Sequence, residues 1–115
     1  GMLADGGTRD SKYLLKMGYP TFCRYRNPVE AFGRYEYEYC QKPVKIRGGL
    51  VKFITVNPGD FVFGDMDGAI IIPKDLTLKV LEVCEEYFNL ENKTREDFKK
   101  GLDPVKVYEK YGRIW

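Results

Sequence analysis

The hydrophobic pattern of the sequence changes at Pro73, and this change constrains the fold more than any other feature. Between residues 20 and 73, short apolar or alternating runs are separated by turn signals such as Pro-Gly, Gly-Gly and Asp-Gly, which is typical of short β-strands. After Pro73, apolar residues recur at helical spacing. Because the strands come first and the longer helices follow, rather than alternating with them, the order indicates an α+β fold.

Two hairpins are predicted in the strand-rich part. Residues 61–73 place two apolar runs on either side of Asp67-Gly68, which is a strong signal for a tight turn. Residues 43–56 flank Gly48-Gly49 in a similar way. The run Ile70-Ile71-Ile72 is typical of a strand covered on both faces, so we expect the first of these hairpins to lie in the core.

Residues 34–41 alternate tyrosine with glutamate, and this period of two predicts a strand with Tyr35, Tyr37 and Tyr39 on one face. Such a face is either a base-stacking surface for nucleic acid or a buried sheet face or subunit interface. Glu36 and Glu38 would repel phosphates, which favours the second interpretation. Residues 20–26 predict a further strand.

The helical segments have recognisable ends. We expect Thr8 or Asp10 to cap the first helix and Asp75 or Thr77 to cap the second. The predicted helices are 11–17 before Gly18, 76–88, 92–100 before Gly101, and 104–111 before Gly112. A chain of 115 residues has the length of one domain, so we expect residues 1–74 to form its β-rich core and residues 75–115 a helical tail of the same domain.

The composition excludes several classes of function. The sequence contains no histidine, which removes Ser-His-Asp and Cys-His catalysis and classical zinc fingers. A net charge of +2 favours neither nucleic acid nor a membrane surface, and no apolar run approaches the length of a membrane span. Cys23, Cys40 and Cys84 form no Cys-x-x-Cys pair, so we expect reduced, buried thiols in a cytoplasmic protein.

Two groups of charged side chains have both a functional and a structural interpretation. The aspartates form either an oxygen-rich cation site or parts of the hairpin turns, and turn chemistry is sufficient to explain them. The arginines either meet an anionic ligand or lie on a solvated strand face, and we favour the solvated face. The groups are Asp60, Asp65 and Asp67, and Arg24, Arg26 and Arg34.

An ordered set of motifs resembles a known family. The motifs are Gly-Gly-Thr-Arg-Asp at 6–10, Gly-Tyr-Pro-Thr-Phe at 18–22, the stretch 43–49, Val-Asn-Pro-Gly-Asp at 56–60, Gly-Asp-Met-Asp-Gly at 64–68, and Ile-Pro at 72–73. As a set they are similar to the RraA-like family, which contains the regulator of ribonuclease E activity A and the 4-hydroxy-4-methyl-2-oxoglutarate/4-carboxy-4-hydroxy-2-oxoadipate aldolases. The resemblance covers residues 5–74 closely and the helical tail more loosely.

The resemblance implies a swivelling β/β/α domain that assembles as a homo-oligomer, a trimer or hexamer, with sites at subunit boundaries. Arg9 would bind the carboxylate and keto oxygen of a small 2-oxo acid substrate, and Asp10 would hold Mg²⁺ or Mn²⁺. The implied enzyme is a metal-dependent (class II) pyruvate aldolase or oxo-acid lyase, whose chemistry needs no histidine. The simpler interpretation of Arg9-Asp10 is a helix-capping turn with a local ion pair, and the two roles are compatible.

The sequence departs from the aldolase pattern in two places. The family places an aspartate about twenty residues before the Arg-Asp pair, preceded by a glycine-rich loop, whereas only eight residues precede Arg9. We therefore expect the chain to lack the N-terminal part of the family domain. No acidic residue occurs at 11–15, where the aldolases carry one after the pair. Glu30 and Glu91 are carboxylates that could approach the site across a subunit boundary.

Two functions follow as alternatives. The first is a lyase acting on 2-oxo acids, with the short chain weak or inactive alone. The second is a non-catalytic regulator of RNA processing that binds a protein partner, as the ribonuclease regulator does. The absence of an acid after Asp10 favours the second, and the Arg9-Asp10 pair favours the first.

Overall fold

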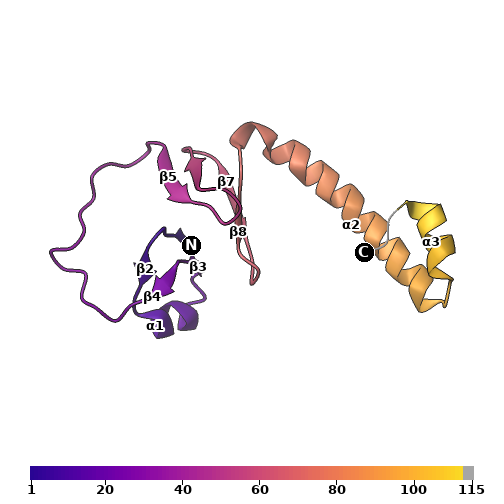
Figure 1. The fold of residues 1–115 in the computed structure, drawn as a ribbon, viewed down its shortest axis with the longest axis horizontal. Coiled ribbons are helices and arrows are strands. Elements are labelled where there is room, and N and C mark those ends of the chain that lie inside the picture. Colours follow the sequence, from indigo (N-terminus) through magenta and orange to yellow (C-terminus); the bar gives the residue numbers. More distant parts are fainter. Residues whose placement is uncertain (113–115) are drawn as a thin grey trace. The chain divides into compact units, whose positions relative to one another are not determined.

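A computed structural model describes residues 1–112 of the chain, and Figure 1 shows the order of its elements. The chain divides into two compact units, Gly1–Lys74 and Asp75–Trp115, which we call the N-terminal unit and the C-terminal unit. Within residues 1–112, the strands lie in the N-terminal unit, whereas α2 (Thr77–Lys99) and α3 (Pro104–Tyr111) lie in the C-terminal unit. The mixture of strands followed by helices confirms the α+β prediction.

The first part of the N-terminal unit consists of two short parallel strand pairs connected through a short helix. The strands β1 (Met2–Leu3) and β2 (Gly7–Thr8) pair in parallel with β3 (Thr21–Phe22) and β4 (Tyr25–Arg26), respectively. The connection contains α1 (Ser11–Lys16), because parallel neighbours need a crossover and not a tight turn. Gly18 follows the helix at a φ of 63°, a left-handed conformation that glycine adopts without strain.

Two antiparallel hairpins follow, as the sequence predicts. In the first, β5 (Val44–Arg47) pairs with β6 (Phe53–Val56), with Val44 opposite Val56. In the second, β7 (Phe61–Gly64) pairs with β8 (Ala69–Ile72), with Phe61 opposite Ile72. Gly68 closes the second turn at a φ of 144°, where a residue with a Cβ atom is strained.

The strand predicted at 34–41 is wrong, because no described strand pairs with this segment. A period of two predicts a strand only where a neighbouring backbone supplies hydrogen bonds, and Gln41 at a φ of 54° also turns the chain out of an extended path. The tyrosines are exposed rather than buried, and Tyr37 keeps 93% of its surface accessible. The prediction of a buried sheet face is therefore wrong within this chain.

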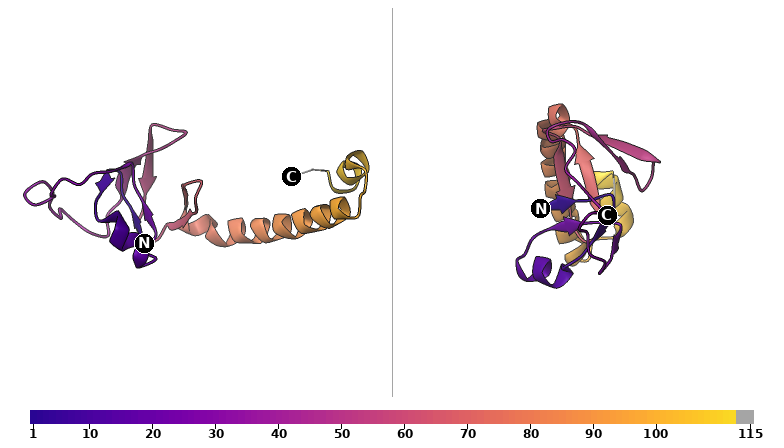
Figure 2. Two further views of the ribbon diagram at one scale, coloured as in Figure 1. Left: turned by 90° about the horizontal axis from the view of Figure 1, so that it is seen from below. Right: turned by 90° about the vertical axis from the view of Figure 1, so that its left-hand side faces the viewer.

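The C-terminal unit is a helical hairpin, which Figure 2 shows in two views. A 3₁₀ turn (Lys74–Leu76) leads into α2 (Thr77–Lys99), which is followed by α3 (Pro104–Tyr111). The two helices predicted at 76–88 and 92–100 are one continuous helix, because residues 89–91 include neither proline nor glycine to interrupt it. Leu76 occupies the N-cap of α2, so the capping prediction for Asp75 or Thr77 is wrong.

The two helices of the hairpin pack around one valine and one carboxylate. Val107 of α3 is completely buried, and Thr94 and Asp97 of α2 are also buried. Asp97 Oδ2 accepts hydrogen bonds from Lys110 Nζ at 2.8 Å and from Tyr111 OH at 3.0 Å. These bonds, that of Lys110 first, lower the pKa of Asp97, and Asp97 in turn raises the pKa of Lys110. The carboxylate is therefore ionised and satisfied at neutral pH.

Apolar side chains remain exposed throughout the described residues. Val107 is the one hydrophobic residue that residues 1–112 bury fully. Ile70 is 56% exposed, so the predicted covering of both faces of the 70–72 strand is wrong for the single chain. Cys40 and Cys84 are also exposed and Cys23 is half-buried, which corrects the expectation of three buried thiols. Isolated strand pairs expose both faces, and a lone hairpin cannot cover its own apolar side chains.

Candidate functional site

Arg9 and Asp10 form the turn between β2 and α1. Asp10 has a left-handed backbone (φ 59°, ψ 26°) at the N-cap of α1, but its side chain makes no capping hydrogen bond. Its Oδ2 atom instead accepts from Arg9 Nε at 3.0 Å. The local ion pair predicted from the sequence is thus present, whereas the predicted capping by the Asp10 carboxylate is wrong. The turn presents both charged groups to solvent, with 40% of the Arg9 side chain and 58% of the Asp10 side chain exposed.

Glu30 joins this turn from within the same chain. Its Oε2 atom lies 2.7 Å from Arg9 Nη1, and its Oε1 atom accepts from the backbone N–H groups of Ala31 at 2.8 Å and Phe32 at 3.2 Å. Hydrogen bonding to Arg9, followed by these two N–H groups, lowers the pKa of Glu30. Glu30 was one of two carboxylates considered for an approach across a subunit boundary, and within this chain the 27–43 loop brings it to Arg9 directly. Glu91 pairs instead with Arg95 within α2, at 3.0 Å.

A single guanidinium, that of Arg9, forms ion pairs with two carboxylates, those of Asp10 and Glu30. Hydrogen bonds from Arg9 to Glu30 and then to Asp10 raise the pKa of Arg9, so the guanidinium is permanently charged. A planar guanidinium with exposed N–H donors suits a carboxylate ligand. Exposed ion pairs of this kind are weak, so a ligand can exchange with either carboxylate at little cost.

Asp10 is the carboxylate of the turn with an oxygen to offer a cation, because both oxygens of Glu30 are bonded to Arg9 or to backbone N–H groups. Among residues 1–112, no three His, Cys, Asp or Glu side chains lie close enough together to form a ready metal site. Asp10 could supply one oxygen ligand, since its Oδ2 is already bonded to Arg9. Mg²⁺ commonly binds through one or two carboxylates and keeps several waters, so the donor set fits a hydrated ion but is only part of a site.

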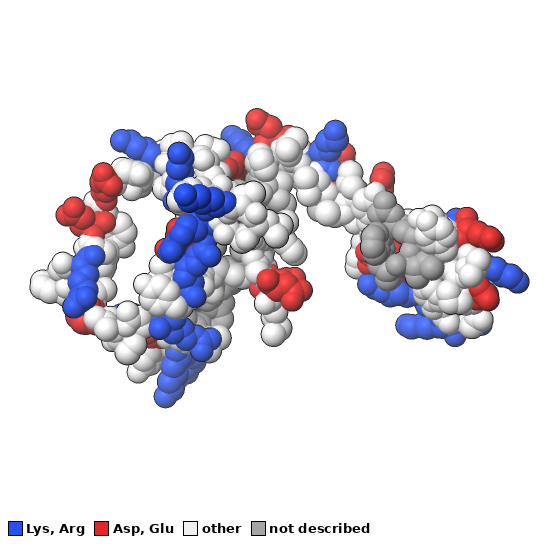
Figure 3. Space-filling view, in the orientation of Figure 1, with Lys and Arg blue, Asp and Glu red and all other residues white. Residues whose placement is uncertain are grey.

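A second charged cluster, which sequence reasoning missed, is centred on Asp5. Its Oδ1 atom lies 2.8 Å from Arg24 Nε, and its carboxylate also accepts from the backbone N–H of Arg47 at 2.9 Å and from Arg47 Nε. The Arg47 backbone bond, followed by the bond from Arg24, lowers the pKa of Asp5 to about 2. Figure 3 shows basic side chains gathered over the middle of the N-terminal unit.

Arg24, one of the three arginines considered for an anionic ligand, therefore has a structural role, because it bonds to Asp5. Besides Asp5, its Nη2 atom contacts the carbonyl oxygen of Arg47. This cluster ties the 4–6 segment to β5 across 42 positions of sequence. The only sequence signal was the proximity of Asp5 to the Gly6-Gly7 turn, which indicates a bend but not its distant partner.

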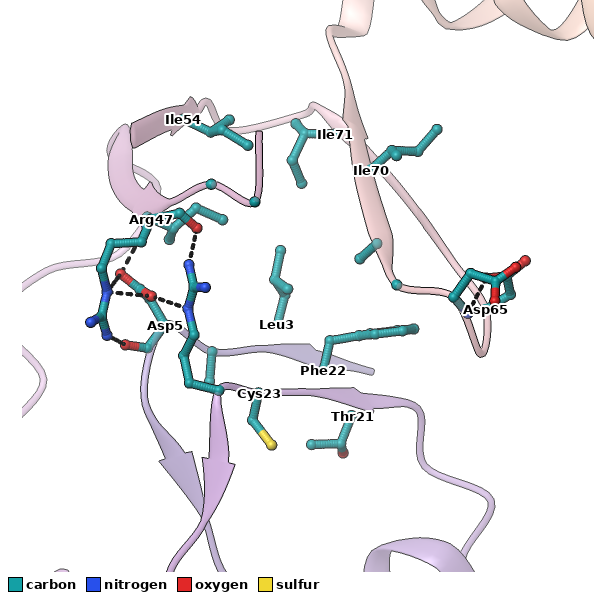
Figure 4. Close-up of a pocket in the computed structure, with 18 of the residues that line it drawn as sticks. Leu3, Asp5, Thr21, Phe22, Cys23, Arg47, Ile54, Asp65, Ile70 and Ile71 are labelled. Carbon is teal, nitrogen blue, oxygen red and sulfur yellow. Dashed lines mark hydrogen bonds and ion pairs between the residues drawn. The ribbon is translucent and has the colours of Figure 1, made fainter. Parts of the chain in front are cut away.

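The Asp5 cluster borders an open apolar cavity of about 960 Å³. Figure 4 shows Leu3, Phe22 and Ile71 directed toward this space, and Ile46, Ile54 and Ile70 also line it. A smaller cavity of about 280 Å³ adjoins the Arg9 turn and is lined in part by Thr8, Ser11 and Arg26. Apolar groups make up most of the lining of the smaller cavity, among them Leu14, Leu15 and Pro20, so it suits a small, partly apolar ligand next to the turn.

The three aspartates considered for a cation site are used in turns. Asp60 accepts from the backbone N–H groups of Asn57 at 2.8 Å and Lys74 at 3.1 Å, and these bonds lower its pKa. Asp65 Oδ1 accepts from the N–H of Asp67 at 2.8 Å within the β7–β8 turn. The turn interpretation of these residues is confirmed by this geometry.

Comparison with known proteins identifies the family. Residues 1–71 match the RraA-like family, described as Aldolase/RraA. This chain belongs to the RraA-like family. The match includes Arg9, Asp10, Glu30 and the Asp5 cluster, so all the clusters of the N-terminal unit described above lie within the family region.

The RraA-like chain is similar to several longer proteins. It is 31% identical over 81 residues to "Protein DlpA" of Legionella pneumophila, which covers 70% of this chain and 12% of that protein. It is 29% identical over 86 residues to the "Putative 4-hydroxy-4-methyl-2-oxoglutarate aldolase" of Halalkalibacterium halodurans, covering 75% of this chain and 38% of the relative. The chain therefore spans well under half the length of these curated relatives.

The fold is also similar to a solved structure. An uncharacterized protein from Pseudomonas syringae pv. tomato superposes with a TM-score of 0.77 at 26% identity, covering 89% of this chain and 48% of that one. The RraA-like chain thus has a mixed α+β fold with a C-terminal helical region that a longer protein shares. Separately, no helix within residues 1–112 is long and apolar enough to cross a membrane.

Proposed function

We propose that this RraA-like chain belongs to a divalent-metal-dependent lyase that cleaves 2-oxo acids to release pyruvate. The observation that carries the proposal is the exposed Arg9 guanidinium, held in a turn by Asp10 and Glu30 within the family region. The name of the Halalkalibacterium relative supports the same class of reaction. The swivelling β/β/α arrangement of the family is part of this proposal.

In this proposal, Arg9 binds and orients the substrate. Its planar fork donates parallel hydrogen bonds to the carboxylate and the keto oxygen of a 2-oxo acid. Asp10, on the same turn, holds Mg²⁺ or Mn²⁺ together with water molecules. When bound, such an ion supplies Lewis-acid stabilisation for the enolate left by carbon–carbon cleavage. No histidine is needed for these roles.

We expect low activity from the 115-residue chain alone. The Arg9 side chain is 40% exposed, so its charge is screened by water instead of acting in a closed site. A covered site would strengthen the same interactions. A homo-oligomer, a trimer or hexamer, would provide such a cover, and the exposed apolar side chains of the N-terminal unit support this expectation.

Pyruvate release from oxaloacetate, measured with and without added Mg²⁺, tests the proposed lyase. We expect slow Mg²⁺-dependent release that Arg9→Ala and Asp10→Ala each reduce by at least tenfold, since each removes a group that touches substrate or metal. Arg34→Ala, which removes an equal charge from the exposed loop, is the matched control and should leave the rate unchanged. Robust turnover that survives Asp10→Ala would exclude the metal assignment.

A protein-binding regulator of RNA processing is the second candidate. The exposed aromatic segment supports it, since Phe32 is 90% and Tyr37 is 93% exposed, and aromatic side chains are enriched at protein interfaces. A ribonuclease assay with the chain added would show inhibition that Tyr37→Ala relieves if this function holds. Mg²⁺-dependent pyruvate release without any effect on the ribonuclease would favour the lyase.

A further inference from the structure

The guanidinium of Arg9 is already engaged on both of the edges that can bind a carboxylate. An arginine offers one edge through Nε and Nη2 and another through Nη1 and Nη2. Asp10 occupies Nε of the first edge at 3.0 Å, and Glu30 occupies Nη1 of the second at 2.7 Å. A ligand carboxylate that binds either edge through two parallel hydrogen bonds must therefore compete with a carboxylate of the chain itself.

Glu30 is the better placed of these two competitors. Its Oε1 atom is held by the backbone N–H groups of Ala31 and Phe32, which leaves Oε2 free to contact Arg9. Two local hydrogen bonds therefore fix the carboxylate independently of Arg9. Asp10 is the neighbouring residue in the sequence and contacts Nε alone. Glu30 comes instead from a separate loop, so it approaches Arg9 from outside the turn, as a ligand would.

We propose that Glu30 acts as an internal carboxylate that occupies the place of the substrate carboxylate on Arg9 and so sets the affinity of this site for 2-oxo acids. The inference rests on the proposed function of Arg9. Glu30 is a positioning residue in this account, because it acts on the ligand only through Arg9. With 40% of the Arg9 side chain and 67% of the Glu30 side chain exposed, their ion pair is weak. Its removal should strengthen ligand binding on the order of fivefold.

Oxalate, a dicarboxylate that resembles the enolate of pyruvate, is a suitable probe in an NMR titration of the full chain at low salt. We expect Glu30→Gln to bind oxalate on the order of fivefold more tightly than the unsubstituted chain. The amide oxygen of glutamine can still accept from Ala31 and Phe32, so the loop is retained, and the chemical shifts of these two amides report whether it is. Glu36→Gln removes the same charge from the same exposed loop and is the matched control.

The outcomes separate this inference from the proposed function. Tighter binding by Glu30→Gln alone, abolished when Arg9→Ala is added, is the expected result. Equal affinities of Glu30→Gln and the unsubstituted chain, with binding that still depends on Arg9, would overturn the inference and leave the proposed function intact. An equal gain in Glu36→Gln would also overturn it, by showing a general effect of charge. Absence of Arg9-dependent binding in every variant would overturn the proposed function, and this inference with it.

Discussion

Asp5 connects three segments of the N-terminal unit through one carboxylate. It accepts from the side chain of Arg24 and from both the backbone and the side chain of Arg47, which lie far from it in the sequence. Each of these bonds stabilises the ionised carboxylate, which explains the fall of its pKa to about 2. The stability of the N-terminal unit therefore depends on pH through the ionisation of Asp5.

We expect Asp5 to stabilise the N-terminal unit at neutral pH and to lose this effect in acid. Its pKa is about 2 in the folded chain, below its ordinary value of about 3.9. The stabilisation is therefore fully present above pH ~4 and lost as the pH falls through about 2. Asp5→Asn should speed hydrogen exchange of the Arg47 amide at neutral pH but make little difference near pH 2.

Glu36→Gln is the matched control for this measurement, because it removes a carboxylate from the exposed loop. Its exchange rate at the Arg47 amide should equal that of the unsubstituted chain at every pH. An Asp5→Asn variant whose Arg47 amide stays equally protected at neutral pH would contradict the structural role given to Asp5.

Among the helices and strands, α3 has the clearest local sequence signals for where it begins and ends. Asp103 caps α3 by accepting from the N–H of Val105 at 2.8 Å, Pro104 occupies the first turn, and Gly112 ends the helix at a φ of 71°. These local signals explain why the helix was predicted at its observed limits. Its contact with α2 depends instead on Val107, whose partners the sequence does not reveal.

Val107→Ala should destabilise the packing of α3 on α2 by about 2 kcal/mol, because it removes two buried methyl groups and leaves a small cavity. Chemical denaturation followed by circular dichroism measures this change through the loss of helical signal. Val105→Ala is the matched control on the same helix, since Val105 is 64% exposed, and its effect should be much smaller. Equal effects of the two substitutions would show that Val107 does not anchor the hairpin.

Across residues 1–112, many large hydrophobic side chains are exposed, whereas Val107 alone among the hydrophobic residues is fully buried. The strand pairs of the N-terminal unit border an open cavity, and residues such as Phe63 and Ile70 remain more than half exposed. Exposed apolar area of this kind is typical of surfaces that take part in interactions. The relatives are longer than this chain, which covers 38% of the Halalkalibacterium protein and 48% of the solved Pseudomonas chain.

We expect the chain to self-associate in a concentration-dependent manner, since association removes this apolar surface from water. Sedimentation velocity should show larger species that Ile70→Asp shifts toward the monomer, because a charge on β8 opposes burial. Met66→Asp places the same charge at the fully exposed tip of the β7–β8 turn and should have little effect. A monomer at all concentrations would contradict the expectation.

The sequence alone determined the order and type of most elements and the identity of the family. The turn residues were sufficient to predict the two hairpins, and proline and glycine to predict the limits of α3, because these signals act within a few residues. The ordered motifs, including Arg9 and Asp10, were sufficient to predict the RraA-like family that the match over residues 1–71 confirms.

Which distant residues meet depends on the folded arrangement of the chain. The Arg9–Glu30 pair and the Asp5–Arg24–Arg47 cluster join positions far apart in the chain, and no local pattern encodes such a contact. In the segment 34–41 a local pattern is present without the contact. Tyrosine and glutamate alternate there as in a strand, but no backbone of residues 1–112 pairs with the segment. Periodicity reports what a segment can form by itself, whereas pairing and burial depend on what the rest of the polypeptide places beside it.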